Sequence, residues 1–216
     1  GLFLILIYLT ISSCSQTDKS DKKFTLKGEI IGQDTGRIIL IYVKNLTRIT
    51  DSTIIKRGAF IFKGEIEEPT QATIYSGNEA NNAWIYLQPG IMQVTLTKDN
   101  FKDFKLTGSK TQDELNELTK MEEPIRSRLD NLKKQQISII DSIANSKTDL
   151  SKKKFEKIAK EIDSQLNQGK ENLNSLWIKF VVDNPKSYIT PPYLRRLEES
   201  GVIPLDSVNS IFKGLD

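Results

Sequence analysis

Few residues of this 216-residue chain have side chains suited to catalysis or metal binding. Histidine is absent and cysteine occurs once, at Cys14. This composition excludes Ser-His-Asp triads, Cys-His dyads, C-x-x-C redox pairs and zinc sites built from histidine or cysteine. The glycine-rich phosphate-binding motifs G-x-G-x-x-G and G-x-x-x-x-G-K-[ST] are also absent. Only carboxylate or lysine chemistry remains, so the sequence favours a non-enzymatic module without a cofactor or a metal.

Cys14 follows an uncharged apolar run, LFLILIYLTI at residues 2–11. This run is too short to span a bilayer as a helix and is typical of the central region of a secretory signal. The stretch Ile11-Ser12-Ser13-Cys14 resembles the lipobox of bacterial lipoproteins, in which the cysteine is lipidated and becomes the mature N-terminus. We therefore predict a signal peptide at residues 1–13 and lipidation of Cys14. A free thiol and a membrane-spanning anchor are the alternatives.

Two features around this segment extend the prediction. The chain begins at Gly1 without Met or a basic region, so we expect the first residues of the signal to precede Gly1. Ser15 follows Cys14, and by analogy with other lipoproteins this favours sorting to the outer membrane. The polar residues up to 23 have the composition of a flexible tether, which together with the lipidated cysteine would occupy residues 14–23.

The charge of the chain argues against nucleic acid as a partner. The formal net charge is +3, spread over 31 basic and 28 acidic residues. A nucleic-acid binder concentrates its positive charge on one face or in one block. With Cys14 lipidated, no cysteine remains for a disulfide, so stability must come from core packing.

Residues 24–108 carry the pattern of an antiparallel β domain. In FTLKGEII the residues Phe24, Leu26 and Ile30 alternate with polar ones, and RIILIYV at 37–43 is apolar on both faces, as in a central strand covered on both sides. Seven or eight short strands at this spacing indicate an antiparallel sandwich or barrel. FTLKGEI at 24–30 and FIFKGEI at 60–66 share five residues, and we expect Gly28 and Gly64 to permit a bulge or a close backbone approach.

From residue 109 the apolar period changes to that of helices, which predicts an α+β protein. Thr111 and Glu114 form a capping box, and Pro124 should kink or divide the first helix. A connection at 145–149 should fold a second helix back, making a hairpin over about 111–184, followed by short helices around 191–199 and 205–213. The two apolar stripes are Leu115, Leu118, Ile125, Leu129, Leu132, Ile139 and Ile143, and Phe155, Ile158, Ile162, Leu166, Leu173, Trp177 and Phe180.

Trp84 and Tyr86 are the candidate ligand or partner surface. They share one face of AWIYLQPG, and Ile85 and Leu87 share the other. If the aliphatic pair faces the core, the two rings lie outward, where aromatic side chains often contact sugars or proteins. The loop SGNEANN at 76–82 carries polar groups that such a site would use. The alternative is that the helical hairpin covers both rings.

The run Lys152-Lys153-Lys154 allows two interpretations. Lysines attract anionic lipid, but Glu156, Glu161 and other acidic residues follow within a few turns. This interspersion favours a solvated helix face with surface ion pairs.

The order of several short motifs resembles the domain of unknown function 4369. These motifs are FTLKGEIIGQDTGRIILIYV, Asp51-Ser52, KRGAFIFKG at 56–64, Glu68-Pro69, the turn LQPG at 87–90 and LTGS at 106–109. In that family a β domain on an envelope lipoprotein is followed by a helical segment and then by a thioredoxin-like domain of the thiol-disulfide interchange type. FVVDNPKS at 180–187 is similar to the F-x-x-x-N-P-x-S run of such proteins.

Three functional hypotheses follow from the motifs and this resemblance. The first is a lipid-anchored periplasmic module of the outer membrane that acts as a spacer, a dimerisation domain or a recognition domain for an envelope protein, with a homodimer formed through the hairpin. The second is a fragment of a thiol-disulfide oxidoreductase whose thioredoxin-like domain lies beyond Asp216. The third is a lipoprotein that binds a glycan or small ligand at Trp84 and Tyr86.

Overall fold

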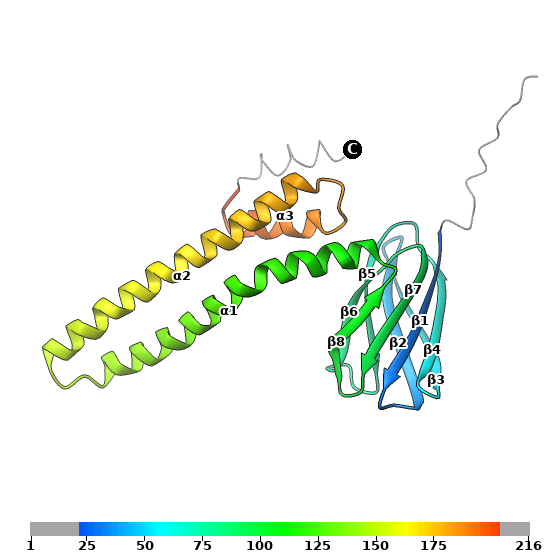
Figure 1. Ribbon diagram of the computed structural model, residues 1–216, viewed down its shortest axis with the longest axis horizontal. Coiled ribbons are helices and arrows are strands. Elements are labelled where there is room, and N and C mark those ends of the chain that lie inside the picture. The colour runs from blue at the N-terminus through cyan, green and yellow to red at the C-terminus, as the bar shows by residue number, and fades with distance from the viewer. Residues whose placement is uncertain (1–21, 204–216) are drawn as a thin grey trace, which may run out of the picture. The chain divides into compact units, whose positions relative to one another are not determined.

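The computed structural model describes residues 22–203, which belong to two compact units divided between Gly108 and Ser109. The first unit is a β domain and the second is helical, so the predicted α+β class is confirmed (Figure 1). The predicted signal peptide, Cys14 and the helix expected around 205–213 lie outside the described residues.

The β domain is one eight-stranded sheet with the strand order β6-β5-β2-β3-β4-β1-β7-β8. The two end strands approach each other, because Asn81, just before β6, accepts a hydrogen bond of 2.8 Å at Oδ1 from the backbone N–H of Phe101 in β8. The sheet is therefore nearly closed and barrel-like, as the sequence predicted. The strands are β1 (Lys23–Ile31), β2 (Thr35–Lys44), β3 (Thr47–Lys56), β4 (Ala59–Glu65), β5 (Thr70–Ser76), β6 (Asn82–Leu87), β7 (Gly90–Thr97) and β8 (Asn100–Thr107).

One strand pairing is not antiparallel. Strand β1 pairs with β4 in the antiparallel direction but with β7 in the parallel direction. Each turn reverses the chain, so all odd-numbered strands run the same way, and two odd-numbered neighbours must be parallel. Alternating hydrophobicity identifies the strands but not their neighbours, which is why the purely antiparallel expectation was wrong at this one pair.

The inward faces of the strands form a continuous hydrophobic core that includes Phe24, Leu26 and Ile30, as predicted. Strand β2 departs from its prediction. It is central, pairing with β3 and β5, and Ile38 and Leu40 are buried. Its outward side chains are only partly covered, however, and Val43 is 49% exposed, so the strand is not buried on both faces.

The two similar segments FTLKGEI and FIFKGEI are neighbours in the sheet. They lie in β1 and β4, and their register places Phe24 opposite Gly64 and Gly28 opposite Phe60. A Cβ on Gly28 would lie 1.8 Å from the Phe60 ring, and one on Gly64 would lie 2.6 Å from the Phe24 ring. Each glycine therefore makes room for the aromatic ring of the other strand. This confirms the predicted close approach and gives the repeat a physical reason.

The helical unit contains α1 (Lys110–Ala144), α2 (Asp149–Asp183) and α3 (Thr190–Glu199). Helices α1 and α2 form the predicted hairpin, and residues 145–148 connect them (Figure 1). The first helix begins earlier than predicted. Its N-cap is Ser109, whose Oγ accepts a hydrogen bond from the backbone N–H of Gln112, so the Thr111–Glu114 capping box was wrong. The S-x-x-Q stretch two residues upstream supplies the same kind of cap.

Pro124 lies inside α1 without dividing it. The helix is continuous from Lys110 to Ala144, and Figure 1 shows its axis changing direction along its length. A proline removes one backbone donor, but packing against α2 on both sides of this position keeps the helix together. The core of the hairpin consists of Leu129, Leu132, Ile162 and Leu166, with Ile125, Ile139 and Ile158 packed against it.

Candidate functional site

The outer face of β6 carries the predicted pair Trp84 and Tyr86. Ile85 and Leu87 are fully buried, so the inward direction of the aliphatic pair is confirmed. Trp84 is 59% exposed and lies opposite Thr73 of β5. Tyr86 lies opposite Gln71 and is partly buried. The face therefore presents one large exposed ring beside hydroxyl and amide groups.

The loop between β5 and β6 lines a separate hollow at one end of the β domain. The hollow has a volume of 540 Å³, and its lining residues are Gln33, Thr35, Ser76, Gly77, Asn78, Asn81, Lys98 and Asp99. Several of these polar groups already bond to the protein: Gln33 Nε2 donates to Ser76 Oγ at 2.9 Å, and Asn81 Oδ1 accepts from Phe101. Trp84 is not part of the lining. The structure thus does not combine the loop and Trp84 into the single site that the sequence suggested.

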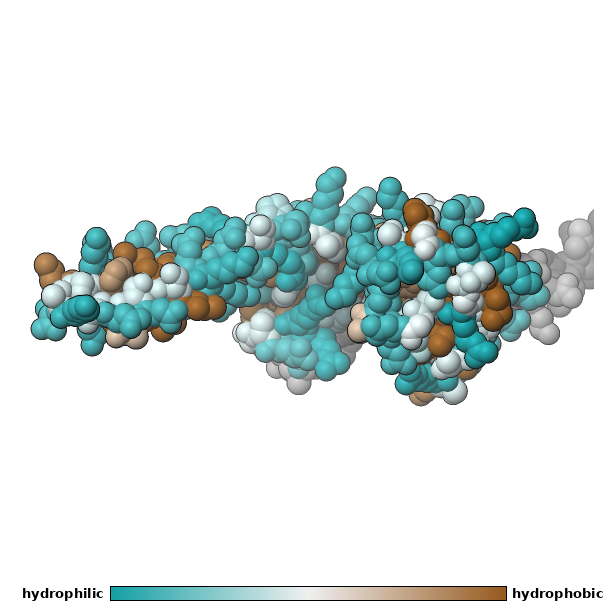
Figure 2. Space-filling model, turned by 90° about the horizontal axis from the view of Figure 1, so that it is seen from below, coloured by the Kyte–Doolittle hydropathy of each residue, from teal (hydrophilic) through white to brown (hydrophobic). Residues whose placement is uncertain are grey.

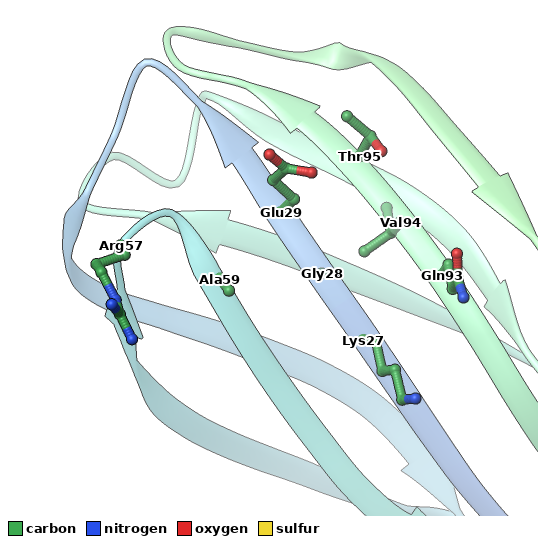
Figure 3. Close-up of a pocket in the computed structure, with 8 residues that line it drawn as sticks. All are labelled: Lys27, Gly28, Glu29, Arg57, Ala59, Gln93, Val94 and Thr95. Atoms are coloured by element: carbon green, nitrogen blue, oxygen red, sulfur yellow. The ribbon is translucent and has the colours of Figure 1, made fainter.

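A second hollow, of 280 Å³, lies on the outer face of β1 between β4 and β7. Figure 3 shows Lys27 and Glu29 on β1, Gln93 and Thr95 on β7, and Arg57 at the turn before β4. Ala59 has a small side chain, so it does not fill this hollow. Lys27, Glu29 and Arg57 form no ion pair among residues 22–203. All three side chains are exposed, so the hollow is a shallow polar surface rather than an enclosed site.

The most unusual polar group in the helical unit is Glu122 of α1, which is 3% exposed. Its Oε1 accepts a hydrogen bond of 2.6 Å from Trp177 Nε1 on α2, and its Oε2 accepts one of 2.7 Å from Arg126 Nε. A buried carboxylate is costly unless its oxygens are bonded, and here both are. The Arg126 guanidinium also lies 5.8 Å from the centre of the Trp177 ring.

Tyr193 of α3 completes this cluster. Its ring lies edge-on to Trp177 with 5.6 Å between centroids, and the Arg196 guanidinium lies 4.8 Å from its centre. Burial, followed by the charge and the hydrogen bond of Glu122, raises the pKa of Tyr193 to about 12. The cluster joins all three helices, and Glu122, Trp177 and Tyr193 are buried within it, so we interpret it as a structural connection.

Sequence reasoning missed Glu122, although a signal was present. The apolar stripe Leu118, Ile125 and Leu129 continues through position 122 at helical spacing, and an acidic residue on such a stripe needs a buried partner. Trp177 lies on the second stripe and supplies its indole N–H.

The FVVDNPKS run has a visible structural role. Phe180 packs against Tyr193, with 6.1 Å between the ring centroids. Asn184 caps α2, with its backbone N–H and Nδ2 both donating to Phe180 O at 2.9 Å. Ser187 Oγ donates to Glu114 Oε2 of α1 at 2.6 Å. The run therefore ends α2 and places α3 against the hairpin.

Comparison with protein families gives a match to the β domain. Residues 24–115 match the family described as domain of unknown function, DUF4369. The resemblance inferred from the motif order is thus confirmed for this part of the chain. No curated protein and no solved structure matched the chain.

The DUF4369 match covers the sheet from Phe24 onward and the first residues of α1, and most of the hairpin lies outside it. In that outer part, no side chain of residues 133–161 is buried. The segment nevertheless contains seven large apolar residues, namely Ile137, Ile139, Ile140, Ile143, Leu150, Phe155 and Ile158. We call residues 133–161 the distal hairpin.

Cys14, the predicted lipidation site, precedes the DUF4369 domain and lies outside the described residues. No helix within residues 22–203 is both long enough and apolar enough to cross a membrane. Over the same residues, the carboxylate side chains form no group of three or more suited to holding a metal ion.

Proposed function

We propose that the chain is a lipid-anchored, non-catalytic envelope module whose DUF4369 domain carries a helical hairpin for dimerisation or partner recognition. The lipobox-like stretch before Cys14 supports the anchor, and with Ser15 it supports a periplasmic location at the outer membrane. The module would act as a spacer and recognition domain, in the manner of the N-terminal part of thiol-disulfide interchange lipoproteins.

The observation that carries this proposal is the uncovered apolar surface of the distal hairpin. Ile137 and Ile140 of α1 are 63% and 56% exposed. They lie three residues apart, so they share one side of the helix, with Ala144 continuing the row one turn later. Full burial of one such isoleucine is worth about 1.5–3 kcal/mol, which is a substantial driving force for association.

A second copy of the chain is the partner that we propose for this surface. In a two-fold dimer both protomers use the same patch, so Ile137 and Ile140 of each protomer would be buried at the interface. Antiparallel helix pairs that associate in this way form four-helix bundles, in which the apolar faces of all four helices meet in one core.

Sedimentation analysis tests the dimer. We expect the protein to be dimeric at tens of micromolar and the variant Ile137→Lys, Ile140→Lys to be monomeric, with its association weakened by at least about 100-fold because each 1.4 kcal/mol is a factor of ten. The matched control is Ile54→Lys, Ile61→Lys, which changes two isoleucines on the outer face of the β domain that are 53% and 51% exposed. A wild-type monomer at this concentration, or equal loss in both variants, would contradict the proposal.

A further inference from the structure

The end of the hairpin carries positive charge beside an exposed leucine. Leu150, in the first turn of α2, is 82% exposed. Lys147, Lys152, Lys153, Lys154 and Lys157 surround it in sequence and are all exposed. None of these lysines forms an ion pair with another described residue. We call Leu150 and these five lysines the basic tip.

Helical spacing gathers part of the basic tip on one face. Leu150, Lys153, Lys154 and Lys157 lie at positions i, i+3, i+4 and i+7 of α2, which are neighbours on a helix surface. Figure 2 shows hydrophobic side chains lying among hydrophilic ones at this end of the hairpin. This face therefore combines three positive charges with one exposed aliphatic side chain.

The charge of the distal hairpin is strongly asymmetric. Residues 133–161 contain eight lysines and no arginine, against the four acidic residues Asp141, Asp149, Glu156 and Glu161. This segment therefore has a net charge of +4, which exceeds the +3 of the entire chain. The acidic residues that suggested a solvated face thus leave a clear excess of positive charge.

We propose that the basic tip binds the surface of an anionic lipid bilayer, with Leu150 entering the interface between headgroups and acyl chains. Lysine is a flexible point charge that suits a diffuse layer of phosphates, whereas recognition of defined carboxylates on a protein favours the planar fork of arginine. The tip is a convex helix end with one aliphatic side chain at its surface, a shape that a fluid interface accommodates without a preformed pocket. The basic tip uses residues other than Ile137 and Ile140, so the lipid-binding proposal does not depend on the proposed dimer.

Vesicle binding of the mature chain without its anchor tests this inference. The protein carries Cys14→Ser and lacks residues 1–13, the predicted signal peptide, so neither a lipid nor the apolar run at residues 2–11 contributes to the binding. We expect this protein to co-sediment with phosphatidylglycerol-containing vesicles, to ignore pure phosphatidylcholine, and to be released by high salt, because salt screens the attraction. Lys152→Glu, Lys153→Glu, Lys154→Glu should weaken binding by at least about 100-fold.

The matched control is Lys98→Glu, Lys102→Glu, Lys105→Glu. It changes the net charge equally but lies on the β domain, where the three lysines are also exposed and form no ion pair with the described residues. Binding should persist in this control. Equal loss in the two triple variants would show that only net charge matters and would overturn the proposal.

Insertion of Leu150 has its own measurement. Cys14 is the only cysteine, so Leu150→Cys in the Cys14→Ser background gives a single site for an environment-sensitive dye. The dye should report an apolar environment on anionic vesicles, whereas a dye at Leu46→Cys, where the native leucine is fully exposed on the β domain, should not. A dye signal that vesicles leave unchanged at both positions would overturn the proposal. Binding to polyglutamate without binding to vesicles would also overturn it and would indicate an acidic macromolecule as the ligand.

Discussion

Glu122 and Tyr193 show how single residues of this chain depend on partners far away in sequence. Glu122 bonds to Trp177, 55 residues further on, and its charge acts on Tyr193 in the third helix. Removing one partner of such a buried group leaves the other unsatisfied, which costs more than the bond itself contributes. The cluster should therefore be sensitive to changes that keep the shape of the side chains and alter their polarity.

The raised pKa of Tyr193 predicts an alkaline loss of stability. The pKa is about 12 in the folded chain and 10.0 without the fold, so the folded state holds the phenol proton more tightly. This contribution is complete below pH 10 and is lost as the pH rises through 12. It amounts to about 2–3 kcal/mol, since one pKa unit corresponds to 1.36 kcal/mol.

Urea unfolding of the protein and of Tyr193→Phe measures this effect. The wild type should lose more stability than the variant between about pH 9 and about pH 11.5, because phenylalanine has no proton to release. Lysine deprotonation is common to both proteins and cancels in the comparison. Parallel pH profiles would show that Tyr193 ionises as freely in the folded state as in the unfolded one.

At the scale of elements, β1 and β4 are joined by two reciprocal contacts between a glycine and an aromatic ring. The Phe60 ring occupies the space where a Cβ of residue 28 would lie, and the Phe24 ring does the same at residue 64. Both phenylalanines are buried, so neither ring has free volume into which it could move. The packing of β1 against β4 therefore requires that residues 28 and 64 have no Cβ atom.

Gly28→Ala should therefore destabilise the β domain by about 1–3 kcal/mol, the usual cost of overpacking. Phe60→Leu in the same chain should recover part of this loss, because the shorter side chain leaves room for the new methyl group. Thermal or urea unfolding of the two single variants and the double variant gives the coupling between them. Strictly additive losses would mean that the ring and the glycine do not share this space.

The sequence predicted the elements themselves well, for reasons that are local. Alternating residues such as Phe24, Leu26 and Ile30 identify strands because successive side chains point to opposite faces, and the helical stripes identify α1 and α2 in the same way. The errors lie where local rules compete. Both Ser109-x-x-Gln112 and Thr111-x-x-Glu114 satisfy a capping motif, and the structure uses the first, in which Ser109 Oγ accepts a hydrogen bond from the backbone N–H of Gln112.

The candidate sites were less predictable than the elements. Trp84 could be placed on an outer face from alternation alone, since Ile85 and Leu87 had to face the core. Whether Trp84 and the loop at 76–82 share a site depends on how that loop folds over the end of the sheet, which alternation does not describe. Ile137 and Leu150 belong to neither helical stripe, and whether another element covers them depends on packing, which the helical period does not describe.

At the scale of the whole molecule, the proposed function predicts a specific chemical form of the native protein. Intact mass and N-terminal fragmentation of the protein from its membrane fraction should show an acylated Cys14 as the first residue. An unmodified Cys14 would remove the lipid anchor from the proposal. The same mass separates the first two of the three hypotheses, because a thioredoxin-sized excess would make this chain the accessory half of an oxidoreductase, and a mass near that of the chain would favour a module acting alone.

The sequence by itself determined the order and type of the elements, the boundary between the β domain and the helices, and the expectation of a lipidated N-terminus. These follow from the fixed repeat of the backbone and from short motifs, which are local properties. Only the tertiary structure decided that β1 lies parallel to β7, that Gly28 lies beneath Phe60, and that Glu122 meets Trp177. Those contacts join residues far apart in the chain, and their geometry is set by how whole elements pack together.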